Sequence, residues 1–260
     1  TVEEAWQGKL MYTNYAPASK AVYDSSGAFT QFMVRPGKRY YLRSALSTLH
    51  KERFRPKVLL EFTDNVVNSI HDLLSDNSMQ FPLPPDTSAE QIETLDPTTK
   101  AIIAENNEGS LFGREAEEFE WIHSFPWVTE NSKQNYPGQY HFTREVSAFK
   151  NLWYRIEHKT ETAFLWITVV NDKMSVPYFL YSHPMQVVAA RQLILKEMVN
   201  NDCAYVTIRH PELGPVLGTR KNPFILSRNM PQLYFAHSSF ADEIPADKKV
   251  HDGDGDCVFT

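Results

Sequence analysis

Alternating and continuous apolar stretches between residues 149 and 181 predict three strands in succession. Leu152, Tyr154 and Ile156 recur at every second position, which is typical of a strand with one buried face. Residues 163–170 are almost wholly apolar and predict a strand that is buried on both faces. A third strand is predicted at residues 176–181. Short polar turns separate the three strands, so together they predict an antiparallel meander.

The chain after the meander carries the pattern of a helix followed by a strand. Ser182 is a candidate N-cap and Pro184 suits the first turn of a helix. Apolar residues then recur at helical spacing as far as residue 199. A strand at residues 203–208 follows, and a helix between two strands predicts that these strands lie parallel in one sheet. The remaining predicted elements are a short helix at 212–217, a closing pair of strands at 224–226 and 232–235, and a last strand at 258–259.

The first 148 residues are less regular. Residues 57–62 are predicted as a strand, and the apolar spacing between residues 66 and 74 predicts a helix after it. Four of the sixteen prolines fall in residues 81–100, which are predicted as a surface loop or linker. Residues 115–122 predict a short helix.

Residues 1–55 hold too few apolar side chains to form a core of their own. We therefore expect them to be an N-terminal extension, or the tail of a preceding half-domain. The main domain is expected at residues 56–260.

Composition narrows the class of protein. Apolar residues make up 42% of the chain and charged residues 22%, which is the balance of a globular protein. The net charge of −6 argues against a nucleic-acid partner. No apolar run is long enough to span a bilayer, so no membrane association is expected. Neither a signal peptide nor an initiator Met is visible at residues 1–6. Cys203 and Cys257 are too few for a disulfide framework; we expect two reduced thiols and a cytoplasmic protein, although one bridge between them is the alternative.

The order of strand, helix, meander, helix, strand, short helix and hairpin resembles that of the GNAT superfamily of CoA-dependent N-acyltransferases over about residues 57–260. The segment Phe-Glu-Trp-Ile-His-Ser-Phe-Pro-Trp-Val at 119–128 resembles a motif of uncharacterised bacterial members. Asp-Gly-Asp-Gly-Asp-Cys-Val-Phe at 252–259 resembles their closing strand. The resemblance implies an α/β fold with a mixed, mostly antiparallel central sheet flanked by helices. It also implies that residues 1–55 end the first half of a tandem arrangement.

In this superfamily the strand equivalent to residues 176–181 parts from its parallel neighbour, here 203–208, and the pantetheine arm of CoA enters the gap. The resemblance thus implies acetyl-CoA or another acyl-CoA as the donor and an amine as the acceptor. Main-chain amides of the strand would hold the thioester, and the following helix start would hold the pyrophosphate. The residues expected to bind the cofactor are Tyr178, Phe179, Leu180, Ser182, Met185 and Gln186.

One part of the chain departs from the family pattern. The phosphate loop of the family contains glycines, whereas residues 181–186 read Tyr-Ser-His-Pro-Met-Gln and contain none. The Fem-type aminoacyl transferases, which share the fold, also lack this loop. Two functions therefore stay open, an N-acyltransferase that uses a CoA thioester or another activated donor, and a non-catalytic domain of the same fold that binds a ligand or partner. A homodimer is also left open.

Three residues are candidates for acid–base chemistry in an acyl transfer. His183 follows the third meander strand and is the candidate base, although it could simply begin the helix. Tyr181 is the candidate acid, or else a core aromatic residue. Glu157 could point into the cleft, or could lie in solvent on its strand.

Other polar clusters have simpler interpretations. Asp252, Asp254 and Asp256 lack the spacing of a calcium loop and predict an acidic turn, and the histidines and cysteines lack the spacing of a zinc site, so no metal is expected. The cations between residues 38 and 57, among them Arg39, could bind an anionic group or form a solvated surface.

Overall fold

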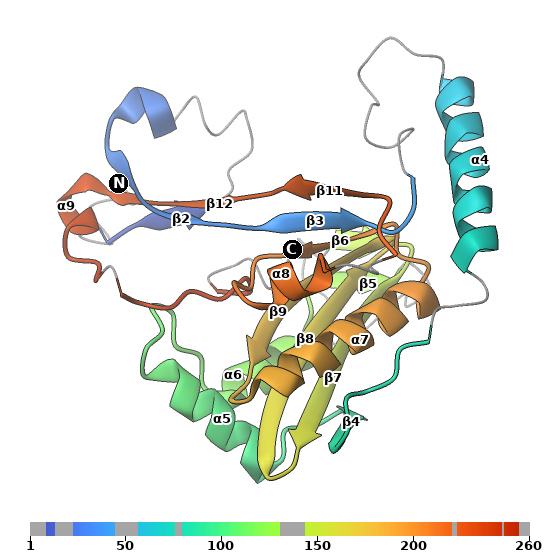
Figure 1. Ribbon diagram of the computed structural model, residues 1–260. Coiled ribbons are helices and arrows are strands. Elements are labelled where there is room, and N and C mark those ends of the chain that lie inside the picture. The colour runs from blue at the N-terminus through green and yellow to red at the C-terminus, as the bar shows by residue number, and fades with distance from the viewer. Residues whose placement is uncertain are drawn as a thin grey trace.

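The computed structural model describes residues 9–13, 23–44, 57–75, 80–130, 144–219, 223–245 and 247–254. The predictions for Cys257 and for a strand at 258–259 lie outside these residues. Figure 1 shows a central sheet with α7 across one face and with α5 and α6 on the other.

Seven strands form the central sheet in the order β11-β3-β10-β9-β8-β7-β4. Their bounds are β11 Leu226–Asn229, β3 Lys38–Tyr41, β10 Tyr205–Ile208, β9 Lys173–Leu180, β8 Glu161–Val170, β7 Phe149–His158 and β4 Thr87–Ile92. Every neighbouring pair is antiparallel except β9 and β10, which are parallel. The predicted fold class and the predicted meander β7-β8-β9 are therefore confirmed.

Two smaller sheets accompany the central one. The first has the order β1-β12-β2, with β1 Met11–Thr13, β12 Gln232–His237 and β2 Phe29–Arg35. The second is a parallel pair of β5 Val128–Glu130 and β6 Arg144–Val146. The helices are α4 Lys57–Ser75, α5 Pro97–Asn107, α6 Ala116–Ser124, α7 Pro184–Asn200, α8 Leu213–Leu217 and α9 Ser238–Ala241.

The core has one apolar cluster on each face of the sheet, and β8 contributes side chains to both clusters. Leu165 and Ile167 belong to the cluster beneath α7 and α8, whereas Phe164 and Trp166 belong to the cluster beneath α5 and α6. All four side chains are fully buried. This alternation is why β8 is apolar at nearly every position, and it confirms the prediction that the strand is buried on both faces.

Residues 29–41 and 226–237 form a long antiparallel ribbon that connects the central sheet with the β1-β12-β2 sheet. The strands β2 and β3 are separated at Gly37, and β12 and β11 at Met230, yet Met230 donates its amide to Gly37 across the break. A side chain at Gly37 would collide with the Met230 carbonyl and with Arg209. Part of the predicted N-terminal extension is therefore a strand of the main sheet, because β3 pairs with β10 as well as β11. The domain boundary at residue 55 stays a prediction.

Several local predictions are wrong. Residues 57–62 are the first turns of α4 and not a strand; a short apolar run does not distinguish the two states, and only Leu60 among its apolar side chains is buried. The stretch 81–100 is not a simple loop, because it holds β4 and the start of α5. The strands β11 and β12 do not pair with each other, since each pairs with a different partner in the ribbon.

Candidate functional site where two parallel strands part

The parallel strands β9 and β10 are joined over only three residues. Their pairing runs from Lys173 to Ser175 on β9, after which β9 continues to Leu180. At the same point β9 bulges on its other side, because two of its residues lie opposite one residue of β8. A bulge bends its strand and frees main-chain groups, and bulges are common next to active sites. The two strands thus part where the resemblance implies a binding gap.

The main chain of β9 that faces the gap is partly occupied. Gly253 donates its amide to the Pro177 carbonyl at 2.9 Å, and the His210 ring hydrogen-bonds the main chain of Phe179. A Cβ at Gly253 would overlap Tyr178, so only glycine allows this approach. The predicted acidic turn at 252–254 therefore forms part of the wall of the gap.

Three titratable side chains surround this wall. Burial raises the pKa of Asp254 to about 6, while its carboxylate accepts hydrogen bonds from the Tyr178 hydroxyl at 3.0 Å and the His251 amide. Burial, followed by the positive charge of Arg35, lowers the pKa of His210 and of His251 to about 4. Both imidazoles are therefore neutral at pH 7, and the Nδ1 of His210 already accepts the amides of Glu212 and Leu213.

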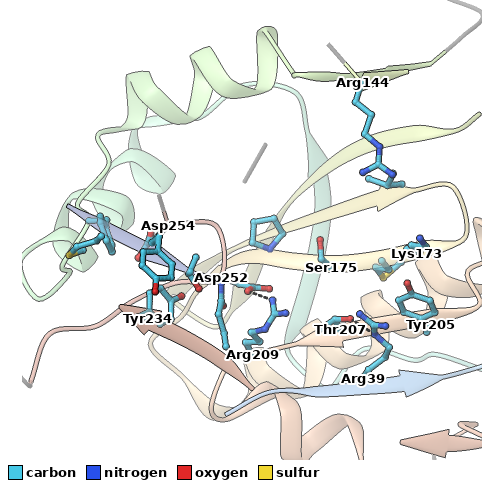
Figure 2. A pocket seen from close by; sticks show the side chains of 18 residues that line it. Arg39, Arg144, Lys173, Ser175, Tyr205, Thr207, Arg209, Tyr234, Asp252 and Asp254 are labelled. Carbon is cyan, nitrogen blue, oxygen red and sulfur yellow. Dashed lines mark hydrogen bonds and ion pairs between the residues drawn. The ribbon is translucent and has the colours of Figure 1, made fainter. Parts of the chain in front are cut away.

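A cavity of about 590 Å³ lies against the polar face of β9 and β10, beside the point where they part (Figure 2). Its lining includes Lys173 and Ser175 of β9, Tyr205 and Thr207 of β10, Arg209 directly after β10, Arg39 of β3 and Arg144 of β6. Asp252 and Asp254 line its other end (Figure 2). The basic end of the cavity thus carries Arg39, Arg144 and Lys173, whereas the acidic end carries Asp252 and Asp254 and also Arg209, which is paired with Asp252.

Arg39 is held in place by two contacts. Its Nε donates to the Thr207 hydroxyl at 3.0 Å, and its guanidinium carbon lies 4.3 Å above the centre of the Tyr205 ring. Arg209 is held differently, because its Nη1 lies 2.6 Å from Asp252. Stacking and a side hydrogen bond fix a guanidinium while leaving its outer N–H groups available for an anion.

The start of α7 satisfies its own polar groups. His183, and not Ser182 as predicted, is the N-cap, and its Nδ1 accepts the Met185 amide at 3.1 Å. Gln186 Oε1 accepts the amides of Ser182 and His183, each at 3.0 Å, and its Nε2 donates to the Glu161 carbonyl. The amides that a pyrophosphate would need are therefore already bonded within the chain, and the carboxylate of Glu161 lies beside them.

The predicted catalytic side chains do not converge. The His183 ring stacks on His158 with 4.4 Å between centroids, whereas Tyr181 stacks on Phe179. Burial, followed by a hydrogen bond to Glu212, raises the pKa of Tyr181.

Glu157 lies two strands away on β7, with 49% of its side chain exposed and Arg155 as its ion-pair partner. The structure does not bring it near the gap.

The side chains predicted to bind the cofactor lie mostly in the core. Tyr178 and Leu180 pack in the cluster beneath α6, and Phe179 packs beneath α7. Gln186 is fully buried, and Ser182 donates its hydroxyl to Glu161 at 3.0 Å. Only the main chain of β9 faces the gap. The cofactor and catalytic roles of all these residues stay predictions.

Sequence reasoning missed the residues that make the cavity. The available signal was the alternation of Lys173 and Ser175, which lie just before the strand predicted at 176–181, and of Tyr205 and Thr207 in the strand predicted beside it. In the sequence, Arg39 stands out only as part of a basic stretch. Arg144 carries no local signal, because β6 comes close to the cavity only through tertiary folding.

Among the described residues, His, Cys, Asp and Glu nowhere gather in threes in a way that could hold a metal ion. None of the helices in the described ranges is long and apolar enough to cross a membrane. Cys203 is buried with a free thiol, and burial raises its pKa to about 12.

Several solved structures align with most of this chain at low identity. A GCN5-related N-acetyltransferase from Anabaena variabilis aligns with 90% of this chain at 8% identity and a TM-score of 0.43. One from Kribbella flavida aligns with 92% at 10% identity and a TM-score of 0.40. A tandem GNAT protein from the clavulanic acid biosynthesis pathway aligns with 88% at 12% identity and a TM-score of 0.43, over 64% of its own length.

The chain spans 47% and 46% of the length of the first two of these structures. No protein-family model matches the chain, and no curated protein matches it. Likenesses at this level concern the course of the backbone, so the site is interpreted from the side chains of this chain alone.

Proposed function

We propose that this chain transfers an acyl group from an activated donor to an amine. The observation that carries the proposal is the parting of β9 from β10 directly after Ser175, at a bulge and beside a cavity large enough for a small molecule. In a strand, the N–H and C=O of one residue point the same way, so the Phe179 amide faces the gap with its carbonyl. An amide in that position can stabilise the oxyanion of an acyl transfer.

A CoA thioester is the donor that the sequence resemblance implies. The start of α7 does not fit its pyrophosphate, because Gln186 and His183 already accept the amides of Ser182, His183 and Met185. A pantetheine arm would bind to main-chain carbonyls along the gap. One of these, the Pro177 carbonyl, already accepts a hydrogen bond from the Gly253 amide. The proposal therefore assigns the transfer to the gap and does not assign the donor's phosphates to α7.

The first experiment is a thermal shift with acetyl-CoA and with longer acyl-CoAs, followed by an assay of thiol release with a panel of amines. A ligand at about 100 times its Kd raises the free energy of unfolding by about 2.7 kcal/mol. Thiol release that depends on the amine is the expected result. If no acyl-CoA shifts the transition and none is consumed, CoA is excluded as the donor.

Two variants locate the donor's phosphates. Ser182→Glu places a carboxylate at the exposed start of α7 and keeps the Gln186 hydrogen bonds, and Gln192→Glu places one farther along the helix. If only the first weakens acyl-CoA binding, the phosphates lie at α7 after all. Equal binding by both variants agrees with the arrangement described above.

A second function, a non-catalytic ligand-binding domain of the same fold, is favoured by a specific observation. The gap contains His210 and the 252–254 turn, and α7 offers no free amide at its start among those described. This function predicts that a small molecule binds in the cavity while no amine is acylated. The two functions are separated by whether binding is accompanied by turnover.

A further inference from the structure

We propose that the amine acceptor also carries an acidic group, a carboxylate or a phosphate, which Arg39, Lys173 and Arg144 bind at the basic end of the cavity. This inference rests on the proposed acyl transfer and names the class of its acceptor. It goes beyond the fold because it depends on individual side chains and not on the course of the backbone.

The first support is that these three cations have no acidic partner. Within the described ranges, no carboxylate lies at ion-pair distance from Arg39, Lys173 or Arg144, whereas Arg209 in the same cavity is paired with Asp252 at 2.6 Å. Three like charges around one cavity repel one another, and an anion among them would relieve that repulsion.

The second support is that the cations come from different strands and face one space. Thr207 lies opposite Arg39 on one side and opposite Ser175 on the other, so these residues form one row across β3, β10 and β9. Neighbouring strands are about 4.8 Å apart, which places the two hydroxyls within reach of an anion bound by Arg39. Lys173 lies in the next row on the same face, opposite Tyr205. Figure 2 shows Arg144 directed toward the cavity from β6.

The third support is a pair of carboxylates at the other end, of which Asp252 is already ion-paired with Arg209. Asp252 and Asp254 lie where β9 parts from β10, near Pro177. Pro177 is four residues from Lys173, or about 13 Å along an extended strand. A linear molecule with an acidic group at one end and an amine at the other would place its amine near Asp254. Its amine would lie beside the gap where the acyl group is transferred.

The test uses isothermal titration with three linear probes at constant ionic strength. 6-Aminohexanoate carries a carboxylate, 6-aminohexyl phosphate carries a phosphate, and hexylamine carries neither. Each is titrated into the wild-type chain, into the double variant Arg39→Gln/Lys173→Gln, and into the control Lys196→Gln/Lys248→Gln. The control removes the same charge from residues outside the cavity.

The expected result is that at least one acidic amine binds about tenfold more tightly than hexylamine, since charge-assisted hydrogen bonds are the strong ones. The Arg39/Lys173 variant should lose about tenfold, and the control should change less than about twofold. The acid that binds more tightly identifies the group. Equal binding of hexylamine, unchanged binding by the Arg39/Lys173 variant, or no binding of any probe would overturn the inference.

Failure of the proposed function would look different. Variant-dependent binding of an acidic amine without any acyl transfer would remove the transferase and leave the anion site. Acyl transfer to hexylamine with the same kcat/KM as to the acidic amines would keep the transferase and overturn this inference.

Discussion

The start of α7 and the cavity beside β9 and β10 use polar groups in opposite ways. At α7, Gln186 alone makes three hydrogen bonds and satisfies two main-chain amides, so a helix start that usually attracts anions is closed by its own side chains. In the cavity, Arg39 and Lys173 have no acidic partner among the described residues. The groups that can bind an anion are therefore the cations of the cavity. The start of α7, where helices of this kind usually bind anions, has its amides bonded within the chain.

The largest expected effect concerns Asp254 at the acidic end of the cavity. Its pKa is raised to about 6 by burial, so the folded chain binds its proton more tightly than the unfolded chain. This stabilisation is fully present below about pH 4. As the pH rises through about 6 it is lost, and the free energy of unfolding falls by about 3 kcal/mol. Asp254→Asn should remove this pH dependence, measured by urea unfolding between pH 4 and 7. The exposed control Asp242→Asn should keep the pH dependence of the wild-type chain. If the wild-type free energy of unfolding differs from that of Asp254→Asn by the same amount at every pH, the prediction is contradicted.

Gln186→Ala tests whether the Gln186 side chain stabilises the start of α7 by accepting main-chain amides. The side chain is fully buried and bridges Ser182, His183 and Glu161, so its loss leaves several polar groups unpaired. We expect the free energy of unfolding to fall by about 2 kcal/mol, measured with denaturant. Gln192→Ala on the same helix should cost less than about 0.5 kcal/mol. Similar values for both variants would show that the closure contributes little.

Thr207→Val tests how Arg39 is positioned. The change keeps the shape of the side chain but removes the oxygen that accepts the Arg39 Nε at 3.0 Å. We expect affinity for 6-aminohexanoate to fall by about fivefold, because the guanidinium becomes less ordered, with a stability change near 1 kcal/mol. The affinity is measured by titration. The control is Thr162→Val in β8, which lies outside the cavity and should leave the affinity unchanged. Unchanged affinity would mean that stacking on Tyr205 alone holds Arg39.

Ser182→Ala should have the smallest effect. The Ser182 hydroxyl donates to Glu161 at an exposed position, and Ser182 is not the cap of α7. We expect a change below about 0.5 kcal/mol by thermal unfolding. A loss above 1 kcal/mol would restore Ser182 as a capping residue.

The sequence predicts the middle of the fold well because its patterns there are strong. The meander, α7, β10 and α8 follow from apolar alternation, helical spacing and a proline at the start of α7. In contrast, β4 is an edge strand with a largely exposed, polar sequence and so has no apolar pattern. The start of α5 did carry a signal, since Asp96 caps the helix and Pro97 follows it.

The site is harder to predict because tertiary packing assembles it. His183 and Glu157 are reasonable candidates by residue type, but one caps its own helix and the other pairs with Arg155. The parting of β9 and β10 was implied by resemblance, and the bulge that accompanies it has no mark in the sequence beyond Pro177. Arg144 reaches the cavity from a strand remote in sequence, which no periodicity can indicate.

The ribbon that joins residues 29–41 to 226–237 has a consequence for synthesis. Thr13 donates its hydroxyl to Leu233 across 220 positions, and the 252–254 turn closes the same wall. The meander and α7 are complete in sequence by residue 200, long before these late segments leave the ribosome. Since distant contacts form slowly, we expect the cavity to form after the meander and α7, with Arg39 and Lys173 exposed in the nascent chain until then.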